Sequence, residues 1–159
     1  MKSSQSSGAK ELQKAKDYAL KYISYRSRTV REVNRKLTDK GYDIEVITLV
    51  VAFLKEYRFL DDECFARNWV ASRMGDKPCG RRRIFSELIQ KGVDRSFIED
   101  SLAGITPDLE RELAVVLVEK KCRRSAFNYN KLKGFLLRRG FSPNTVSAVL
   151  ADYLKNMSE

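Results

Sequence analysis

The residues of this chain that could carry chemistry are three cysteines and a large set of arginines and lysines. The sequence has 159 residues, with 31 Lys+Arg against 21 Asp+Glu and no histidine, so its formal net charge is +10. Without an imidazole there is no Ser-His or Cys-His nucleophile pair and no histidine-ligated zinc. Cys64, Cys79 and Cys122 fit neither a CxxC pair nor a four-ligand zinc spacing. We therefore expect no enzymatic activity, no metal site and no cofactor.

Composition also bears on location. The odd number of cysteines and the lack of an apolar run long enough for a membrane span predict a protein of the reducing cytoplasm. Residues 1–9 are rich in serine without apolar periodicity, which predicts a disordered tail. Carboxylate pairs such as Asp61 and Asp62 are better explained as charges at a helix start than as an acid-base or metal site.

The basic residues are concentrated in the outer parts of the chain. Net charge is +5 over residues 1–57, +1 over residues 58–104 and +4 over residues 105–159. Two explanations stay open: an ordinary solvated helix surface, or repeated basic stripes that face a polyanion or an acidic protein groove. In the first segment Arg28, Arg31 and Arg35 have the i, i+3, i+7 spacing of one helix face. The candidate contact residues are Arg28, Arg31, Arg35, Arg81, Arg82, Arg83, Lys131, Arg138 and Arg139.

A pattern repeated three times, at residues 37–43, 88–94 and 136–142, indicates the elements that must position these side chains. In each copy a leucine stands four residues before a glycine, and an apolar residue follows the glycine. Gly41, Gly92 and Gly140 are therefore predicted to end helices in the left-handed conformation. Asp43, Asp94 and Ser142 follow as predicted N-caps of the next helices.

Each of these helix pairs has an earlier helix before it. In the first repeat this helix is indicated by the i, i+3, i+4, i+7, i+8 spacing of apolar residues from Ala15 to Ile23, and the helix after it begins at a capping box, Thr29 to Glu32. In the second and third repeats it begins at the acidic run that starts at Asp61 and at the pair Thr106-Pro107. No alternation typical of strands is found. The sequence predicts an all-α fold of three tandem three-helix, helix-turn-helix-like repeats, elongated or curved. The repeats are expected at residues 10–57, 58–104 and 105–157.

The predicted third helices limit how the chain could bind nucleic acid. They begin with residues such as Asp43, Glu45 and Asp94, and the arginines or lysines expected for guanine contacts are nearly absent. Any nucleic-acid contact should therefore be made to the backbone, with strong salt dependence and weak sequence specificity. Most aromatic residues, Phe59 and Phe141 among them, fall on apolar faces and are predicted to pack in the core.

Once the repeats are aligned, the chain resembles the RecX family of bacterial regulatory proteins, which modulate the recombinase RecA. The resemblance spans about residues 15–154 and is carried by residues 29–42, 59–66, 82–93 and 135–142. One departure is Arg58, where the family usually has glycine.

The resemblance implies a non-enzymatic inhibitor that binds along the groove of the RecA-DNA filament. Such a protein limits ATPase, strand-exchange and coprotease activities in DNA repair and the SOS response. The implied partners are the RecA filament and single- or double-stranded DNA, contacted through its backbone; no membrane is involved and a monomer is expected. The alternative is a stand-alone DNA-binding protein without sequence specificity.

Overall fold

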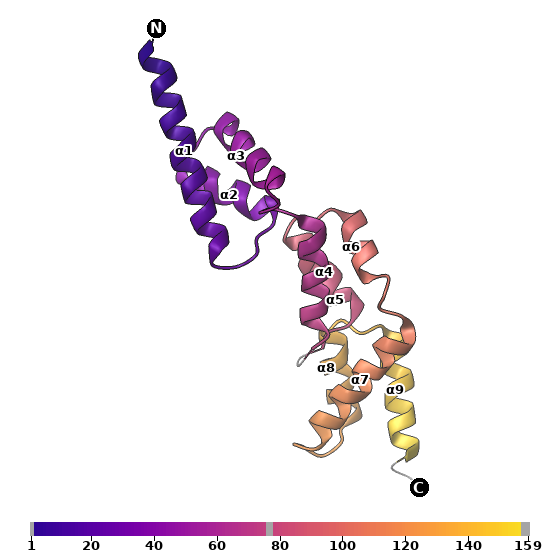
Figure 1. Cartoon of the computed structure of the whole chain (residues 1–159). Coiled ribbons are helices and arrows are strands. Elements are labelled where there is room, and N and C mark those ends of the chain that lie inside the picture. The colour runs from indigo at the N-terminus through magenta and orange to yellow at the C-terminus, as the bar shows by residue number, and fades with distance from the viewer. Residues whose placement is uncertain (1, 76–77, 157–159) are drawn as a thin grey trace. The chain divides into compact units, whose positions relative to one another are not determined.

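The computed structural model describes the backbone of residues 2–75 and 78–156, and the side chains of the same residues from residue 8 onward. Within these ranges the chain forms nine α-helices and no strand, which confirms the predicted all-α fold (Figure 1). The helices are α1 (Lys2–Ser24), α2 (Val30–Lys40), α3 (Ile44–Glu56), α4 (Asp62–Arg73), α5 (Arg81–Gln90), α6 (Arg95–Leu102), α7 (Pro107–Cys122), α8 (Tyr129–Arg138) and α9 (Pro143–Asn156).

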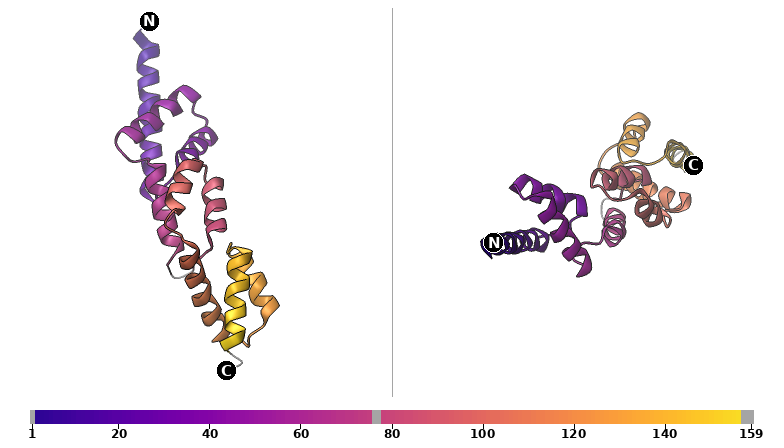
Figure 2. Two further views of the ribbon diagram at one scale, coloured as in Figure 1. Left: turned by 90° about the vertical axis from the view of Figure 1, so that its right-hand side faces the viewer. Right: turned by 90° about the horizontal axis from the view of Figure 1, so that it is seen from above.

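The helices gather into two compact units. One unit contains the described residues up to Phe65 together with Gln90–Asp94; the other contains Ala66–Ile89 and the described residues from Arg95 onward. In the first unit α1, α2 and α3 pack on one another, and in the second α9 packs on both α7 and α8 (Figures 1 and 2). The turn that ends α5 thus belongs to the same unit as the first three helices.

The three predicted helix stops are confirmed. Gly41, Gly92 and Gly140 have positive φ angles of 93°, 77° and 85°. After the first and third stops the chain turns back in the predicted way, because Tyr42 N donates to Leu37 O (3.2 Å) and Phe141 N donates to Leu136 O (3.2 Å).

One further residue shares the left-handed conformation of these glycines. Arg58, between α3 and α4, has a φ of 57°. It stands where the resembled family usually has glycine, so here a residue with a side chain adopts a conformation that favours glycine. A residue with a Cβ is strained there, because the left-handed region is disfavoured for side chains other than glycine.

The predicted helix starts lie at the expected residues, but not every N-cap side chain makes a capping hydrogen bond. The capping box of Thr29 and Glu32 is present, and Thr145 N donates to Ser142 Oγ (3.1 Å) at the start of α9. Asp43 is the N-cap residue of α3 as predicted, with the extended backbone of that position, although its side chain makes no capping hydrogen bond. Asp43 is exposed, and water can therefore satisfy the first N–H groups of α3.

The start of α1 also departs from the prediction. The helix begins at Lys2 and therefore includes residues 2–9, which were expected to form a disordered tail. Extending an existing helix adds one hydrogen bond per residue, so the periodic segment that follows can extend the helix backward through a serine-rich stretch. None of the described helices is long and apolar enough to cross a membrane.

Each unit has its own apolar core. In the first, fully buried side chains of α1, α2 and α3 meet, among them Ala15, Leu37 and Leu54; in the second, α7, α8 and α9 contribute the corresponding core. Phe141 is 1% exposed, which confirms its predicted place in the core. Phe59 is 53% exposed and was wrongly predicted to be buried, because the turn at Arg58 carries it out of the helix pattern.

Candidate interaction surface

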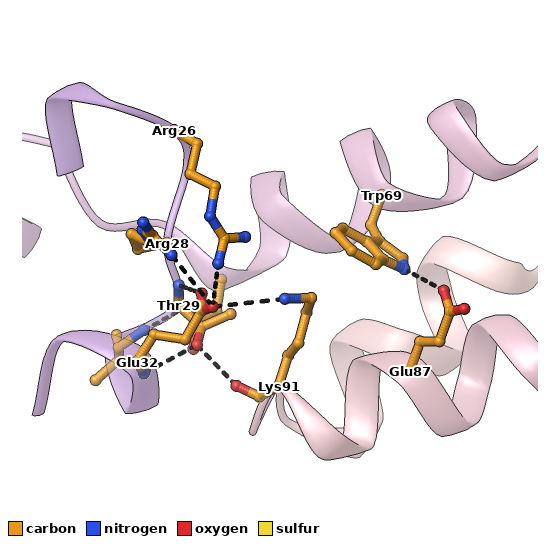
Figure 3. A network of polar contacts seen from close by, with 9 residues as sticks. Arg26, Arg28, Thr29, Glu32, Trp69, Glu87 and Lys91 are labelled. Atoms are coloured by element: carbon orange, nitrogen blue, oxygen red, sulfur yellow. Dashed lines mark hydrogen bonds and ion pairs between the residues drawn. The ribbon is translucent and has the colours of Figure 1, made fainter. Parts of the chain in front are cut away.

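The start of α2 is held by polar contacts to two distant segments of its own unit (Figure 3). Thr29 is fully buried, and its Oγ1 donates to Lys91 O (2.7 Å) while it accepts from Glu32 N (3.2 Å). Val30 N donates to Asp62 Oδ1 (3.0 Å) at the start of α4. Burial raises the pKa of Asp62, and the hydrogen bond from Val30 opposes that shift. The start of α2 is therefore a structural junction.

Three cationic side chains lie close to Glu32 at this junction. Its Oε1 lies 3.2 Å from Arg26 Nη2, 3.8 Å from Arg28 Nη1 and 3.5 Å from Lys91 Nζ (Figure 3). The Arg28 side chain is only 13% exposed, and its Cζ lies 4.1 Å from the centroid of the Tyr22 ring. The Arg28 side chain therefore packs and bonds within the junction.

The predicted helix face of Arg28, Arg31 and Arg35 is corrected in one respect. Thr29 is the N-cap with extended backbone, so α2 begins at Val30 and Arg28 lies outside the helix. Only Arg31 and Arg35 share a face of α2, one turn apart.

A second carboxylate organises the helices of the other unit. Glu87 accepts from Trp69 Nε1 (3.0 Å), Arg73 Nε (2.7 Å) and Arg83 Nε (3.0 Å); Figure 3 shows the contact with Trp69. Burial alone would raise the pKa of Glu87, but the hydrogen bonds from Arg83, Arg73 and Trp69 together outweigh it and the pKa is lowered. Bonding to Glu87 in turn raises the pKa of Arg83.

The start of α5 forms a junction like that at α2. Gly80 N donates to Arg139 O (2.9 Å) and Arg82 N donates to Gly140 O (3.3 Å), so this start lies against the turn that ends α8. Arg81 N donates to Glu110 Oε1 (3.1 Å), and the Arg81 guanidinium donates to Leu102 O (2.5 Å). The guanidiniums of Arg81 and Arg83 therefore both bond within the unit.

The two junctions are built alike: in each, a helix-stop glycine packs against the start of the middle helix of the preceding repeat. A Cβ built on Gly92 would lie 2.7 Å from Arg31 Cβ, and one built on Gly140 would lie 2.5 Å from Arg83 N. Gly41, in the first repeat, has nothing within 4 Å of such a Cβ. The sequence pattern showed the turns but not these approaches, because the partners are about sixty residues away in sequence in each case.

The remaining candidate side chains are available to a partner. Arg35 is 84% exposed and lies 3.9 Å from Asp39. The others are exposed, and none forms an ion pair within the part of the chain that the structure describes: Arg31, Arg82, Lys131 and Arg138.

Arg139 lies at a pocket that the sequence reasoning did not predict. The pocket has a volume of about 430 Å³, and its other basic residues are Lys120, Lys121 and Arg124, at the end of α7. The signal was present as a run of cations at that helix end, but a local pattern could not show that Arg139 joins them.

The structure offers little for metal chemistry. Among the described residues, no group of three or more Cys, Asp or Glu side chains could hold a metal ion. No disulfide bond joins the three cysteines, all of which lie within the described residues; Cys79 is buried, and Cys64 and Cys122 are partly buried.

Comparison with protein families identifies all three repeats. The models described as the first, second and third three-helix domains of RecX match residues 15–54, 61–102 and 108–150. The regulatory protein RecX of Clostridium botulinum is 38% identical over 146 residues, which cover 87% of this chain and 68% of that protein. The protein of the same name from Mycolicibacterium smegmatis is 35% identical over 156 residues, covering 92% and 83%.

Solved structures give the same result. The crystal structure of RecX from Lactobacillus salivarius superimposes with a TM-score of 0.80 at 30% identity, covering 91% of this chain and 97% of that one. A second crystal structure, of a regulatory protein RecX, gives a TM-score of 0.81 at 27% identity, covering 91% and 75%.

Proposed function

Because the chain belongs to the RecX family of regulatory proteins, we propose that it regulates the recombinase RecA by binding along the RecA-DNA filament. The observation that carries the proposal is the match of three successive RecX domains between residues 15 and 150, so each repeat of the regulators is present. In this proposal the protein acts in the cytoplasm as a monomer, without catalysis, and limits the ATPase, strand-exchange and coprotease activities of the filament.

The physical basis of the proposal is the set of basic side chains that the junctions leave unused. Arg31 and Arg35 on α2, Arg82 on α5 and Arg138 on α8 are exposed in three different repeats. Acidic groove residues or nearby phosphates would attract these cations, and linking the repeats in one chain turns modest contacts into higher avidity. Arg28, Arg81 and Arg83, whose guanidiniums have partners within the protein, are given second place as filament contacts, and so is Arg139, which lies at the pocket.

A stand-alone DNA-binding protein is the second candidate function. It is favoured by the net charge of +10 and by the basic pocket of the third repeat. In either function DNA would be contacted through its backbone, since the third helices lack cations that could read bases.

Separate titrations distinguish the two functions. Bare single-stranded DNA and RecA filament on the same DNA are each titrated with the protein at two salt concentrations. The regulator proposal expects tighter binding to the filament. Equal affinity for bare DNA and filament would contradict it, because the affinity of a protein that binds only DNA is not increased by RecA.

A pair of charge reversals tests the contact surface. Arg31→Glu with Arg35→Glu is expected to weaken filament binding, with helicity unchanged in circular dichroism. Lys10→Glu with Lys14→Glu is the matched control, because these lysines have the same spacing on exposed positions of α1 and are not candidate contacts. Equal effects of both pairs would show that only total charge matters and would remove Arg31 and Arg35 from the surface.

A further inference from the structure

The basic pocket of the third repeat has the size of a ligand site and a distinctive lining. Its volume of about 430 Å³ lies within the range of small-molecule pockets. The end of α7 supplies the apolar wall and most of the charge, and α8 with its C-cap supplies an aromatic ring and a further guanidinium. The lining residues that matter here are Leu117, Lys120, Lys121, Arg124, Phe135 and Arg139.

The charge of this pocket is not balanced inside the protein. Elsewhere, clustered cations converge on a carboxylate, as they do on Glu32 and on Glu87. None of the four pocket cations forms an ion pair with a carboxylate of residues 8–75 or 78–156. About four positive charges therefore face one cavity without an internal counterion.

The helix dipoles do not account for this excess. The C-termini of α7 and α8 attract cations, but each is equivalent to only about half a negative charge. Two such ends offset roughly one of the four positive charges. The remaining positive charge lies on exposed or half-buried side chains and is available to an anion from outside the protein.

Phe135 holds two of the cations in place. Lys121 Nζ and Arg139 Cζ each lie 5.4 Å from the centroid of its ring, within the distance of a cation–π attraction. The ring itself packs against the core of α7, α8 and α9. Side chains that are already positioned lose less entropy when a ligand binds, so this arrangement favours binding.

We propose that this pocket is a phosphate-binding site. A terminal phosphate carries up to two negative charges, and successive phosphates of a nucleic-acid backbone carry one each, whereas a single carboxylate offers one charge. Arg124 and Arg139 can bind oxygens in pairs, and Lys120 and Lys121 supply compact charges. The phosphate comes from a nucleic-acid backbone or from a free nucleoside polyphosphate. The site does not depend on the proposed regulation of RecA, and it deepens the second candidate function by naming where a phosphate would bind.

The test uses the full chain in the absence of RecA. A fluorescein-labelled oligothymidylate is titrated by anisotropy at physiological salt, and ATP is titrated by isothermal calorimetry. Arg124→Glu is the pocket variant, and Arg123→Glu is its control, because Arg123 is the exposed neighbouring residue outside the pocket lining and the charge change is the same. Circular dichroism melts check that both variants are folded.

We expect Arg124→Glu to weaken binding about tenfold, and Arg123→Glu to weaken it by no more than about threefold, since a direct phosphate contact is lost only in the first. If the larger loss in Arg124→Glu is seen with the oligonucleotide alone, the phosphate that binds belongs to a nucleic-acid backbone. If it is seen with ATP, the phosphate belongs to a free nucleotide. Equal losses in both variants would overturn the site, and so would the absence of saturable binding of both probes to the wild-type protein.

Discussion

Substituting alanine for each of the three helix-stop glycines should produce unequal losses of stability. All three glycines have positive φ, so each substitution meets the left-handed penalty of about 1 kcal/mol for a residue with a Cβ. Around Gly41 nothing else is affected, because the space within 4 Å of an added Cβ is open. We therefore expect Gly41→Ala to lower the free energy of unfolding by about 1 kcal/mol.

Gly92→Ala should lower the free energy of unfolding more, although both glycines lie in the same compact unit. The new Cβ would lie 2.7 Å from Arg31 Cβ and 2.9 Å from Arg31 Cγ, so the start of α2 must move. Forced displacement in a packed site adds typically about 1 to 3 kcal/mol, which brings the expected loss to about 2 to 4 kcal/mol. Truncation in Arg31→Ala removes Cγ but leaves Cβ, so the double variant should recover only part of the loss.

Urea denaturation followed by circular dichroism measures these differences, and hydrogen exchange assigns the change to a unit. Gly140→Ala extends the series to the second unit, where the added Cβ meets the backbone of Arg83 and truncating that side chain should give no recovery. Equal losses for Gly41→Ala and Gly92→Ala would refute the reasoning, because only the backbone conformation would then matter.

Three further substitutions test particular contacts. Glu87→Gln should destabilise the second unit by about 1 to 3 kcal/mol through weaker bonds to its cations. Folding lowers the pKa of Glu87, so the ionised carboxylate stabilises the fold above its unfolded pKa of about 4.3. This stabilisation is lost as pH falls through the folded pKa. In Glu87→Gln the urea midpoint should therefore no longer show the part of its pH dependence that comes from Glu87. Glu110→Ala leaves Arg81 N and Thr145 Oγ1 without their buried acceptor. It should lower the free energy of unfolding, measured by urea titration, by about 2 to 4 kcal/mol. An unchanged urea midpoint would count against the junction at the start of α5. Arg58→Gly should raise the melting temperature in calorimetry by relieving a left-handed strain of about 1 kcal/mol, and a lower melting temperature would contradict that strain.

The helix stops were predictable from the sequence because their signals are local. A glycine, the leucine four residues before it and the apolar residue after it suffice to end a helix, and all three stops have the expected conformation. Asp43 is the N-cap residue of α3 as predicted, but residue preference alone does not say whether its side chain or water satisfies the first N–H groups of the helix.

The roles of the basic residues were harder to predict because their partners are distant in sequence. Lys91 Nζ meets Glu32 across 59 residues, and the Arg81 guanidinium meets Leu102 O across 21. The basic pocket was missed for the same reason, since two separate helix ends form it. Arg28 was placed on the surface for a different reason: its partners Tyr22 and Glu32 are near in sequence, but the helix face drawn from spacing assumed a helix that in fact begins only at Val30.

The most direct test of the account is the ATPase of RecA filaments on single-stranded DNA, measured against increasing amounts of the purified protein. The account predicts saturable inhibition, weakened by the reversal of Arg31 and Arg35 and unchanged by the reversal of Lys10 and Lys14. An ATPase rate that stays constant while the protein binds bare DNA as tightly as filament would contradict the central claim that this chain is a regulator of RecA.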